Sequence, residues 1–380
     1  MKSLKLVAAL AMLASAACGP VYEKPTEGSS TGFALSFFKE VNKNVKSGEN
    51  VVVSPYSAGV ALSMLAEGAE GETKVEFDNA LNGCLFKAEE LGDEKVVVES
   101  ANSVWISDDF SVRNRYVDLL SRDFKAFVTT LNFADPATLK AINNWCAENT
   151  SGKITEILDR LGPDMVMVLV NALYFNGPWE KAFDPANTAE DVFRGRSGNQ
   201  KVSMMSAKMK LDYAEYQGCQ MVELPYEGER YAMYVVLPPM GMSIEKLMSY
   251  VNENLYDQAM SMMTAEKVRL TMPKLRMETT TVLNSTLQRM GIKTAFTSAA
   301  NFKGIAEMGP LVLDQVKQKC YIDISESGTE AAAVTSIQVR LTSVRPEFDV
   351  KTMTVNRPYV FLIADKETDN ILFAGKIVKL

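Results

Sequence analysis

Side chains that could carry nucleophilic or acid–base chemistry are present in this chain, but the usual combinations of them are missing. The 380 residues contain no histidine. A Ser/His/Asp or Cys/His protease would therefore lack its general base, and a catalytic zinc site would lack its commonest ligand. The sequence also has no Walker phosphate loop and no GxGxxG fingerprint. We therefore expect neither an enzyme nor a bound cofactor or metal.

The cysteines do not indicate chemistry either. Apart from Cys18 there are four, widely spaced and without a CxxC pair. A disulfide framework or a metal site would need closer and more regular spacing. The even number leaves one or two disulfides open, but buried free thiols are the expectation. These four are Cys84, Cys146, Cys219 and Cys320.

The most unusual pattern in the chain is ESGTEAAAVTSIQVRLTS, residues 326–343. From Thr329 onward the residues alternate at period two, which is typical of a strand with one buried face. The first half is almost all Ala, Thr, Ser and Gly, small enough to slide into a narrow slot. No proline interrupts the segment before Pro346, so each residue could donate a ladder hydrogen bond. The pattern is equally compatible with an exposed loop between Gly328 and Pro346.

This segment resembles the hinge and reactive-centre loop of inhibitory serpins, in which Glu, a variable residue, Gly, Thr and Glu precede a run of small residues. The resemblance implies an exposed reactive-centre loop over about residues 326–350. It also implies that a protease cuts this loop as if it were a substrate. The implied hinge residues are Glu326, Gly328, Thr329, Glu330, Ala331, Ala332 and Ala333.

The resemblance also places the scissile bond. Counted as in the family, fourteen residues beyond Gly328, it lies between Thr342 and Ser343. A small residue there suggests an elastase-like or broadly specific target. The loop is several residues longer than in many serpins, so trypsin-like, chymotrypsin-like and papain-like proteases stay open as targets. The alternative cleavage positions are Arg340, Leu341 and Arg345.

Further segments resemble serpins in the family's order and spacing, from about Phe33 to Leu380. The family's NxxxFxGxWxxxF segment is matched from Asn171, and the PKL strand contains Lys274. The resemblance implies a shutter beneath the central sheet and a breach where the loop enters it. At one shutter position, where the family usually has histidine, this chain has Gln318, which leaves the local hydrogen bonds open. The implied residues are Ser54, Ser57 and Asn171 for the shutter, and Trp179, Lys274 and Glu326 for the breach.

The implied fold is α+β, with a mixed central β-sheet, further β-sheets and about eight or nine helices. Local patterns agree with this fold. Residues 165–174, MVMVLVNALY, predict a strand buried on both faces. Ser57 is a candidate N-cap for the second helix, and Pro136 marks the start of an amphipathic helix. That helix resembles the serpin helix that crosses the front of the sheet and must shift when a strand enters.

The N-terminus has the features of an export signal. Lys2 and Lys5 precede an apolar run, 6–13, too short to span a bilayer. Small residues then precede Cys18, which resembles a bacterial lipobox and implies cleavage before Cys18 and lipidation of its thiol, with palmitate among the acyl groups. We predict a signal peptide over 1–17, a tether over 18–32 and a single serpin domain over 33–380. No aspartate follows Cys18, so the resemblance to lipoproteins implies the outer membrane or cell surface of a bacterium.

The expected function is inhibition of serine endopeptidases, with cysteine endopeptidases as a further class. The cleaved loop would enter the central sheet and trap the acyl-enzyme, with the inhibitor acting as a monomer. A net charge of −7 argues against nucleic acid as a partner. The alternative is a non-inhibitory serpin that acts as a binding or structural surface lipoprotein. It would need a hinge that cannot insert, typically with proline or bulky residues between Thr329 and Ser336, and the sequence has none there. A lipoprotein that binds small solutes would need a pocket signature, and the sequence shows none.

Overall fold

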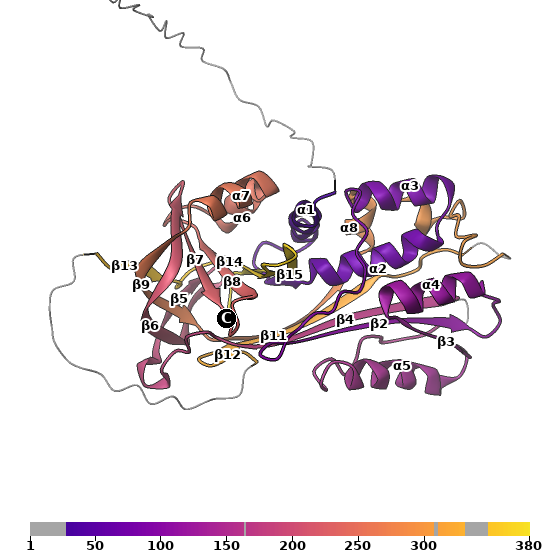
Figure 1. The fold of residues 1–380 in the computed structure, drawn as a ribbon, viewed down its shortest axis with the longest axis horizontal. Helices are drawn as coiled ribbons and strands as arrows, with labels where there is room; N and C mark the ends of the chain where they lie inside the picture. The colour runs from indigo at the N-terminus through magenta and orange to yellow at the C-terminus, as the bar shows by residue number, and fades with distance from the viewer. Residues whose placement is uncertain (1–27, 163–164, 308–310, 331–348) are drawn as a thin grey trace, which may run out of the picture.

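A computed structural model describes residues 28–162, 165–307, 311–330 and 349–380. Two β-sheets form the frame of the molecule, and helices cover both faces of the smaller one (Figure 1). The expected mixed α+β architecture is confirmed. The predicted positions Ala331, Ala332, Ala333, Arg340, Leu341, Thr342, Ser343 and Arg345 lie outside the described residues, as does Cys18.

The smaller sheet has six strands in the order β10-β11-β12-β4-β2-β3. All neighbours are antiparallel except β2 and β3, so the sheet is mixed. Its central strand β4 is apolar on both faces because α2 lies over one and α5 over the other. The strands are β10 (Leu275–Val282), β11 (Lys317–Ser325), β12 (Gly328–Thr329), β4 (Met167–Pro178), β2 (Val97–Ser107) and β3 (Phe127–Leu131).

The larger sheet has nine strands and crosses one end of the smaller one (Figure 1). The hairpin β14–β15 lies between the edge strand β1 and β8, and every residue of its two strands is buried. The strands, in spatial order, are β1 (Val51–Val53), β15 (Asn370–Ile377), β14 (Tyr359–Asp365), β8 (Tyr231–Leu237), β7 (Cys219–Pro225), β6 (Gly198–Tyr216), β9 (Thr264–Pro273) and β13 (Lys351–Thr354), with β5 (Ala189–Gly195) paired to β6.

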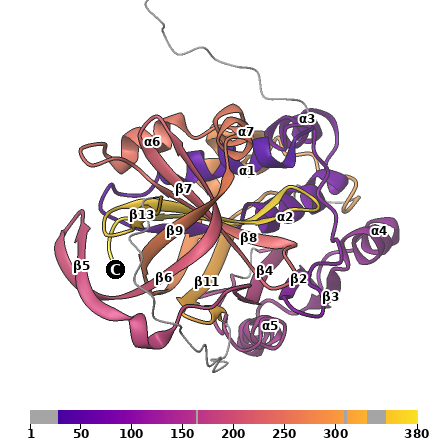
Figure 2. The ribbon, with the colours of Figure 1, turned by 60° about the vertical axis from the view of Figure 1, so that its left-hand side comes forward.

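Eight α-helices occur in the described part of the chain. Helix α5 lies alone on one side of the six-stranded sheet, opposite α1, α2 and α3 (Figure 2). The helices are α1 (Ser30–Asn42), α2 (Pro55–Gly68), α3 (Gly71–Ala80), α4 (Asn114–Phe124), α5 (Pro136–Glu148), α6 (Ile244–Tyr250), α7 (Glu253–Ser261) and α8 (Asn284–Arg289), with short 3₁₀ turns at Pro185–Asn187 and Thr294–Phe296.

The N-cap of α2 differs from the prediction. Ser54, not Ser57, caps the helix, because Pro55 occupies the first helical position, where an N–H would have no intrahelical acceptor and proline has none to satisfy. The Ser54 hydroxyl accepts a hydrogen bond of 3.2 Å from the Ser57 backbone N–H. The strand–turn–helix order is as expected, and the predicted cap lies three residues, about one helical turn, after the observed one.

The apolar side chains form one large core and one smaller cluster. The large core joins the two sheets and the helices α1 and α2, and the hairpin β14–β15 belongs to it. The smaller cluster lies between α5 and the outer face of β2 and β4, around Trp105, Ile142 and Cys146. No helix of the described ranges is long and apolar enough to cross a bilayer.

Candidate functional site

The hinge is not exposed at its start, which corrects the predicted loop boundary. Gly328 and Thr329 are buried and form β12, a two-residue strand between β11 and β4. Thr329 is paired with Ile324 on β11 and with Gly177 on β4. The Glu330 N–H adds one further hydrogen bond, of 2.7 Å, to the Asp323 carbonyl. The first hinge residues thus already belong to the sheet, because small side chains fit between two neighbouring strands.

Beyond β12, the strands β11 and β4 have no shared strand pairing in the described part of the chain. Among the strands of the described residues, only β12 is paired with both of them. Each strand therefore offers an edge of backbone groups toward the other, and such an edge is a template for an additional strand. A strand that extended β12 would complete the sheet along this line.

Thr329 anchors the hinge to the core. Its side chain is 1% exposed, and its hydroxyl and the Tyr226 hydroxyl are 2.7 Å apart. The Tyr226 ring is stacked on Trp179, with ring centroids 4.6 Å apart. Burial raises the pKa of Tyr226, so the phenol stays protonated and remains a donor. Tyr226 follows β7 at a turn, and its local sequence pattern gave no sign of this role.

The three predicted breach residues lie together at this end of the sheet. The Trp179 indole N–H donates to the Ser325 carbonyl at 3.0 Å, and its backbone N–H donates to the Ser327 carbonyl at 2.9 Å. The Lys274 ammonium is 2.8 Å from the Glu326 carboxylate. The Thr188 hydroxyl donates to the same carboxylate at 2.8 Å. These contacts fix the turn that leads from β11 into β12.

The pKa of Glu326 is lowered by its partners. Partial burial alone would raise it, but the Lys274 ammonium and the Thr188 hydroxyl outweigh that effect. The carboxylate is therefore ionised at neutral pH and keeps its ion pair. Because Lys274 is largely exposed, the pair is worth only about 0 to 1 kcal/mol, and it serves to orient the turn.

The predicted shutter residues form two separate hydrogen-bonded pairs. Gln318 on β11 bonds the backbone of Ser54 twice: its amide donates to the Ser54 carbonyl at 2.8 Å, and its carbonyl accepts from the Ser54 N–H at 2.9 Å. The Asn171 side-chain amide on β4 donates instead to the side-chain amide oxygen of Asn102 on β2. Asn171 and Gln318 line the same cavity of about 40 Å³ without bonding each other. Asn102 was not predicted, because it is an ordinary polar residue in the pattern of β2.

Two polar atoms of this region have no partner within the described residues: the Ser57 hydroxyl oxygen and the side-chain oxygen of Asn171. Both are buried, and a buried acceptor without a donor costs about 1 to 3 kcal/mol. Gln318 in place of histidine therefore satisfies Ser54 but leaves these neighbours unpaired. The cost in the shutter region thus comes from buried oxygen atoms without hydrogen-bond donors.

A Gln318→Ala variant is expected to lower the free energy of unfolding by about 1 to 3 kcal/mol, because it leaves the Ser54 N–H buried without a partner and removes one of the two donors to the Ser54 carbonyl, which keeps its bond from the Ala58 N–H. The urea unfolding midpoint measures this loss. Gln315, exposed on the segment before β11, is the matched control, and Gln315→Ala should change the free energy of unfolding by less than about 0.5 kcal/mol. Equal effects of the two variants would contradict the pairing.

The four cysteines that the structure describes are free thiols. Cys146 and Cys320 are buried, and burial raises the pKa of each to about 12. Cys84 and Cys219 are half-buried, and burial raises their pKa as well. None of the four has the lowered pKa of a reactive thiol. The described ranges also contain no cluster of three or more metal-ligating side chains.

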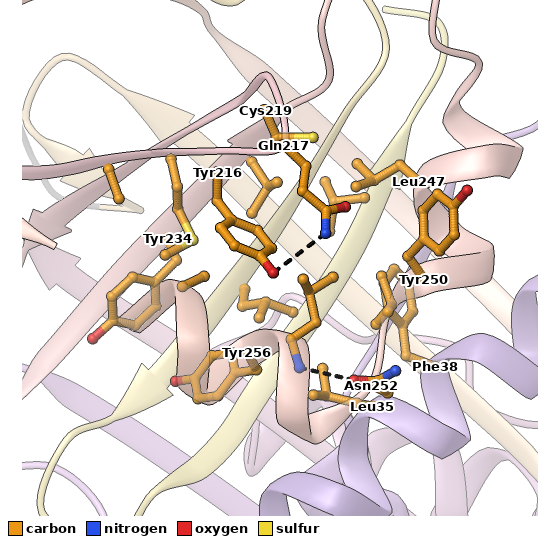
Figure 3. A pocket seen from close by; sticks show the side chains of 18 of the residues that line it. Leu35, Phe38, Tyr216, Gln217, Cys219, Tyr234, Leu247, Tyr250, Asn252 and Tyr256 are labelled. Atoms are coloured by element: carbon orange, nitrogen blue, oxygen red, sulfur yellow. Dashed lines mark hydrogen bonds between the residues drawn. The ribbon is translucent and has the colours of Figure 1, made fainter. Parts of the chain in front are cut away.

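One apolar cavity lies away from the hinge. It has a volume of about 90 Å³ and is lined by α1, α6, α7 and the strands β6, β7, β8 and β14. Figure 3 shows Tyr216, Tyr234 and Tyr256 around it, with Leu35 and Phe38 of α1 at its side. The Gln217 amide donates to the Tyr216 hydroxyl at 3.2 Å. The sequence showed no pocket signature, because the lining residues come from seven separate elements.

The chain is similar to known proteins in its family profile, in its sequence and in its fold. The profile described as Serpin (serine protease inhibitor) matches residues 28–380. An uncharacterized serpin-like protein of Thermococcus kodakarensis is 31% identical, with 94% of this chain and 86% of that protein covered. Intracellular coagulation inhibitor 2 of Tachypleus tridentatus is 30% identical, with 88% and 86% covered. The native thermophilic serpin tengpin has a TM-score of 0.83 and 29% identity, with 95% and 97% covered.

The fold is an α+β fold with a mixed sheet in which the short hinge strand β12 lies between β11 and β4. The family profile matches nearly the whole chain. The chain belongs to the serpin family. The resemblance and the fold predicted from it are thereby confirmed. Serpins are generally protease inhibitors rather than enzymes.

Proposed function

We propose that this protein is a suicide-substrate inhibitor of serine endopeptidases, with cysteine endopeptidases as a further class. The observation that carries the proposal is β12, which already pairs with β11 and β4 and has no strand after it in the described part of the sheet. A cut in the loop would release the chain that follows Glu330 to continue this strand. The hinge sequence supports the proposal because it contains no proline and no bulky residue before Ser336.

The chemistry belongs to the protease. Its nucleophile attacks the carbonyl of the scissile residue, the amine of the next residue leaves, and the inhibitor is held as an acyl-enzyme ester or thioester. Water would normally hydrolyse this bond. Insertion of the cleaved strand pulls the acylated end away from the loop and distorts the active site of the protease before water completes the reaction.

The geometry of the sheet supports a long displacement. Fourteen inserted residues at about 3.3 Å each span on the order of 45 Å. Continuing the observed register places Thr335 opposite Gln318 on β11 and opposite Asn171 on β4. Alternation puts Thr335 on the same inward face as Thr329, so its hydroxyl would supply a donor beside the unpaired oxygen of Asn171.

The free energy released by strand insertion is large enough to distort the active site of the bound protease. At a net 0.5 to 1.5 kcal/mol per hydrogen bond, about a dozen new ladder bonds supply roughly 10 kcal/mol. Relief of the unpaired shutter groups adds to this sum. The intact protein would accordingly be kinetically trapped above its lowest free energy, and cleavage would release the difference.

The target protease follows from the scissile residue. We place the bond at Thr342–Ser343, which suits an elastase-like or broadly specific enzyme, with Arg340, Leu341 and Arg345 as alternatives. The test is incubation with elastase, trypsin, chymotrypsin and papain, followed by denaturing electrophoresis. A complex that survives denaturant, with the new N-terminus of the C-terminal fragment identified by mass spectrometry, supports the proposal. Complete cleavage by all four enzymes without a complex would overturn it.

A second candidate function is binding of a small apolar molecule, and the cavity of about 90 Å³ is the observation that favours it. The dye 8-anilino-1-naphthalenesulfonate is a suitable probe. The second function predicts saturable binding that Ala259→Trp, at the cavity wall, abolishes while the protease complex still forms. Binding that the variant does not change would remove this candidate.

For localisation we propose a lipid-anchored protein of a bacterial outer membrane or cell surface. The support is the lipobox-like sequence before Cys18 and the polar residues that follow it. The predicted tether over 18–32 extends too far, because its last three residues belong to α1. The serpin profile match begins at 28, and α1 begins at Ser30. Labelling with radioactive palmitate tests the anchor: a labelled chain whose label disappears in Cys18→Ala supports it, and an unlabelled chain refutes it.

A further inference from the structure

Glu330 is the last described residue of the hinge, and its placement is unusual. Its backbone has φ 57°, in the left-handed region that a glutamate rarely adopts. Its side chain is only 3% exposed, and neither carboxylate oxygen receives a well-aligned hydrogen bond within the described residues. Burial of a carboxylate is costly without a counter-charge. The structure supplies one, since the Lys153 ammonium lies 3.0 Å from this carboxylate.

The position of Lys153 is fixed by backbone and side-chain contacts. It follows α5 in a turn in which its N–H donates to the Thr150 carbonyl at 2.9 Å, and the next residue, Ile154, is buried against the sheet. Its ammonium also lies 5.4 Å from the centre of the Tyr321 ring on β11. The Glu330 carboxylate, despite partial desolvation, raises the pKa of Lys153, so the lysine stays charged. The pair therefore joins the hinge to the end of α5.

The segment that continues from Lys153 is tied to β11 at two further points. The Lys319 ammonium donates to the Glu156 carbonyl at 2.7 Å, and the Lys317 ammonium lies 2.7 Å from the Asp159 carboxylate. We call residues 150–159 the strap. Since α5 packs over β2 and β4, the strap leads from that side of the sheet to β11, across the line that a strand extending β12 would take.

We propose that Lys153 and Glu330 form a latch that holds the hinge at its two-residue depth of insertion in the intact protein and couples that depth to the position of α5 and the strap. The left-handed backbone of Glu330 is where the chain leaves the sheet, and the ion pair stabilises that departure point. Withdrawal of the hinge would have to break the pair. Deeper insertion would have to bring the backbone of Glu330 into an extended conformation and displace the strap. This statement about deeper insertion rests on the proposed function.

Hydrogen exchange of the intact protein, followed by mass spectrometry of the peptide that contains residues 326–330, tests the latch. Lys153→Met and Glu330→Gln are each expected to speed exchange of this peptide about tenfold, because both remove the ion pair. The charge-swapped double variant Lys153→Glu with Glu330→Lys should restore most of the protection. The matched control is Lys317→Met, which removes the same charge and another tie of the strap without touching the hinge.

The latch predicts one pattern across these four variants. Faster exchange in both single variants, recovery in the swap and no change in Lys317→Met support it. Unchanged exchange in the single variants, no recovery in the swap, or an equal effect of Lys317→Met would overturn it. The measurement needs no protease, so a protein that forms no complex but shows this exchange pattern would lose the proposed function and keep the latch.

Discussion

A Thr329→Arg variant is expected to be cleaved by the target protease at the normal rate but to release it active. Thr329 is buried at the start of the slot, and its hydroxyl meets that of Tyr226 at 2.7 Å. An arginine there would bring an unpaired charge into the sheet, at a cost of several kcal/mol. Insertion would slow relative to hydrolysis of the acyl-enzyme, and the fraction of protease trapped should fall about a hundredfold, since each 1.4 kcal/mol is a factor of ten.

The measurement is the ratio of complex to cleaved inhibitor on a denaturing gel, together with the residual activity of the protease. Thr329→Ser is the matched control, because it keeps the hydroxyl and adds no volume, and it should trap as the parent does. Trapping by the arginine variant at the parent's ratio would mean that insertion does not begin at this residue.

The second large effect concerns stability. Protein cut once in its loop is expected to melt on the order of 20 °C higher than intact protein, because roughly 10 kcal/mol of new ladder bonds stabilise the inserted form. Few proteins gain stability when their chain is cut, so the sign alone is diagnostic. Scanning calorimetry of the intact and nicked forms measures it.

The Thr329→Arg variant serves here as the control. Its loop can be cut, but its hinge should not insert, so the nicked variant should melt near the temperature of the intact variant. Equal melting temperatures for intact and nicked parent protein would remove both the trap and the inhibitory mechanism. A rise in the parent that is absent in the variant would tie the gain to entry of the strand.

Much of the fold could be predicted from the sequence because its signals are local. The apolar run of β4 requires cover on both faces, and α2 and α5 supply it. Pro136 begins α5 as expected, since its missing N–H costs nothing there. The family itself was visible in the spacing of the hinge and of the segment after Asn171. The α2 cap was missed by three residues, because two serines one turn apart are equally good caps until Pro55 decides between them.

The breach could also be predicted, residue by residue, from its resemblance to the family. Trp179, Lys274 and Glu326 meet at one end of the six-stranded sheet. For the shutter, the sequence predicted which residues take part but not which of them are hydrogen-bonded to each other. That Ser54 bonds Gln318 while Asn171 turns to Asn102 depends on which side chains face each other across two strands and a helix. Sequence patterns specify the face of each residue, but the distances across that face come from packing.

The sequence alone determined that this chain is a serpin and that residues 326–343 could be either loop or strand, because small alternating residues without proline satisfy both. Only the tertiary structure decided how many residues of this segment are already part of the sheet in the intact protein. Gly328 and Thr329 lie in the sheet, and Glu330 turns out of it beside Lys153. The reason is physical: the depth of a strand between two others depends on ladder partners and counter-charges that lie far away in the chain, and no local pattern encodes them.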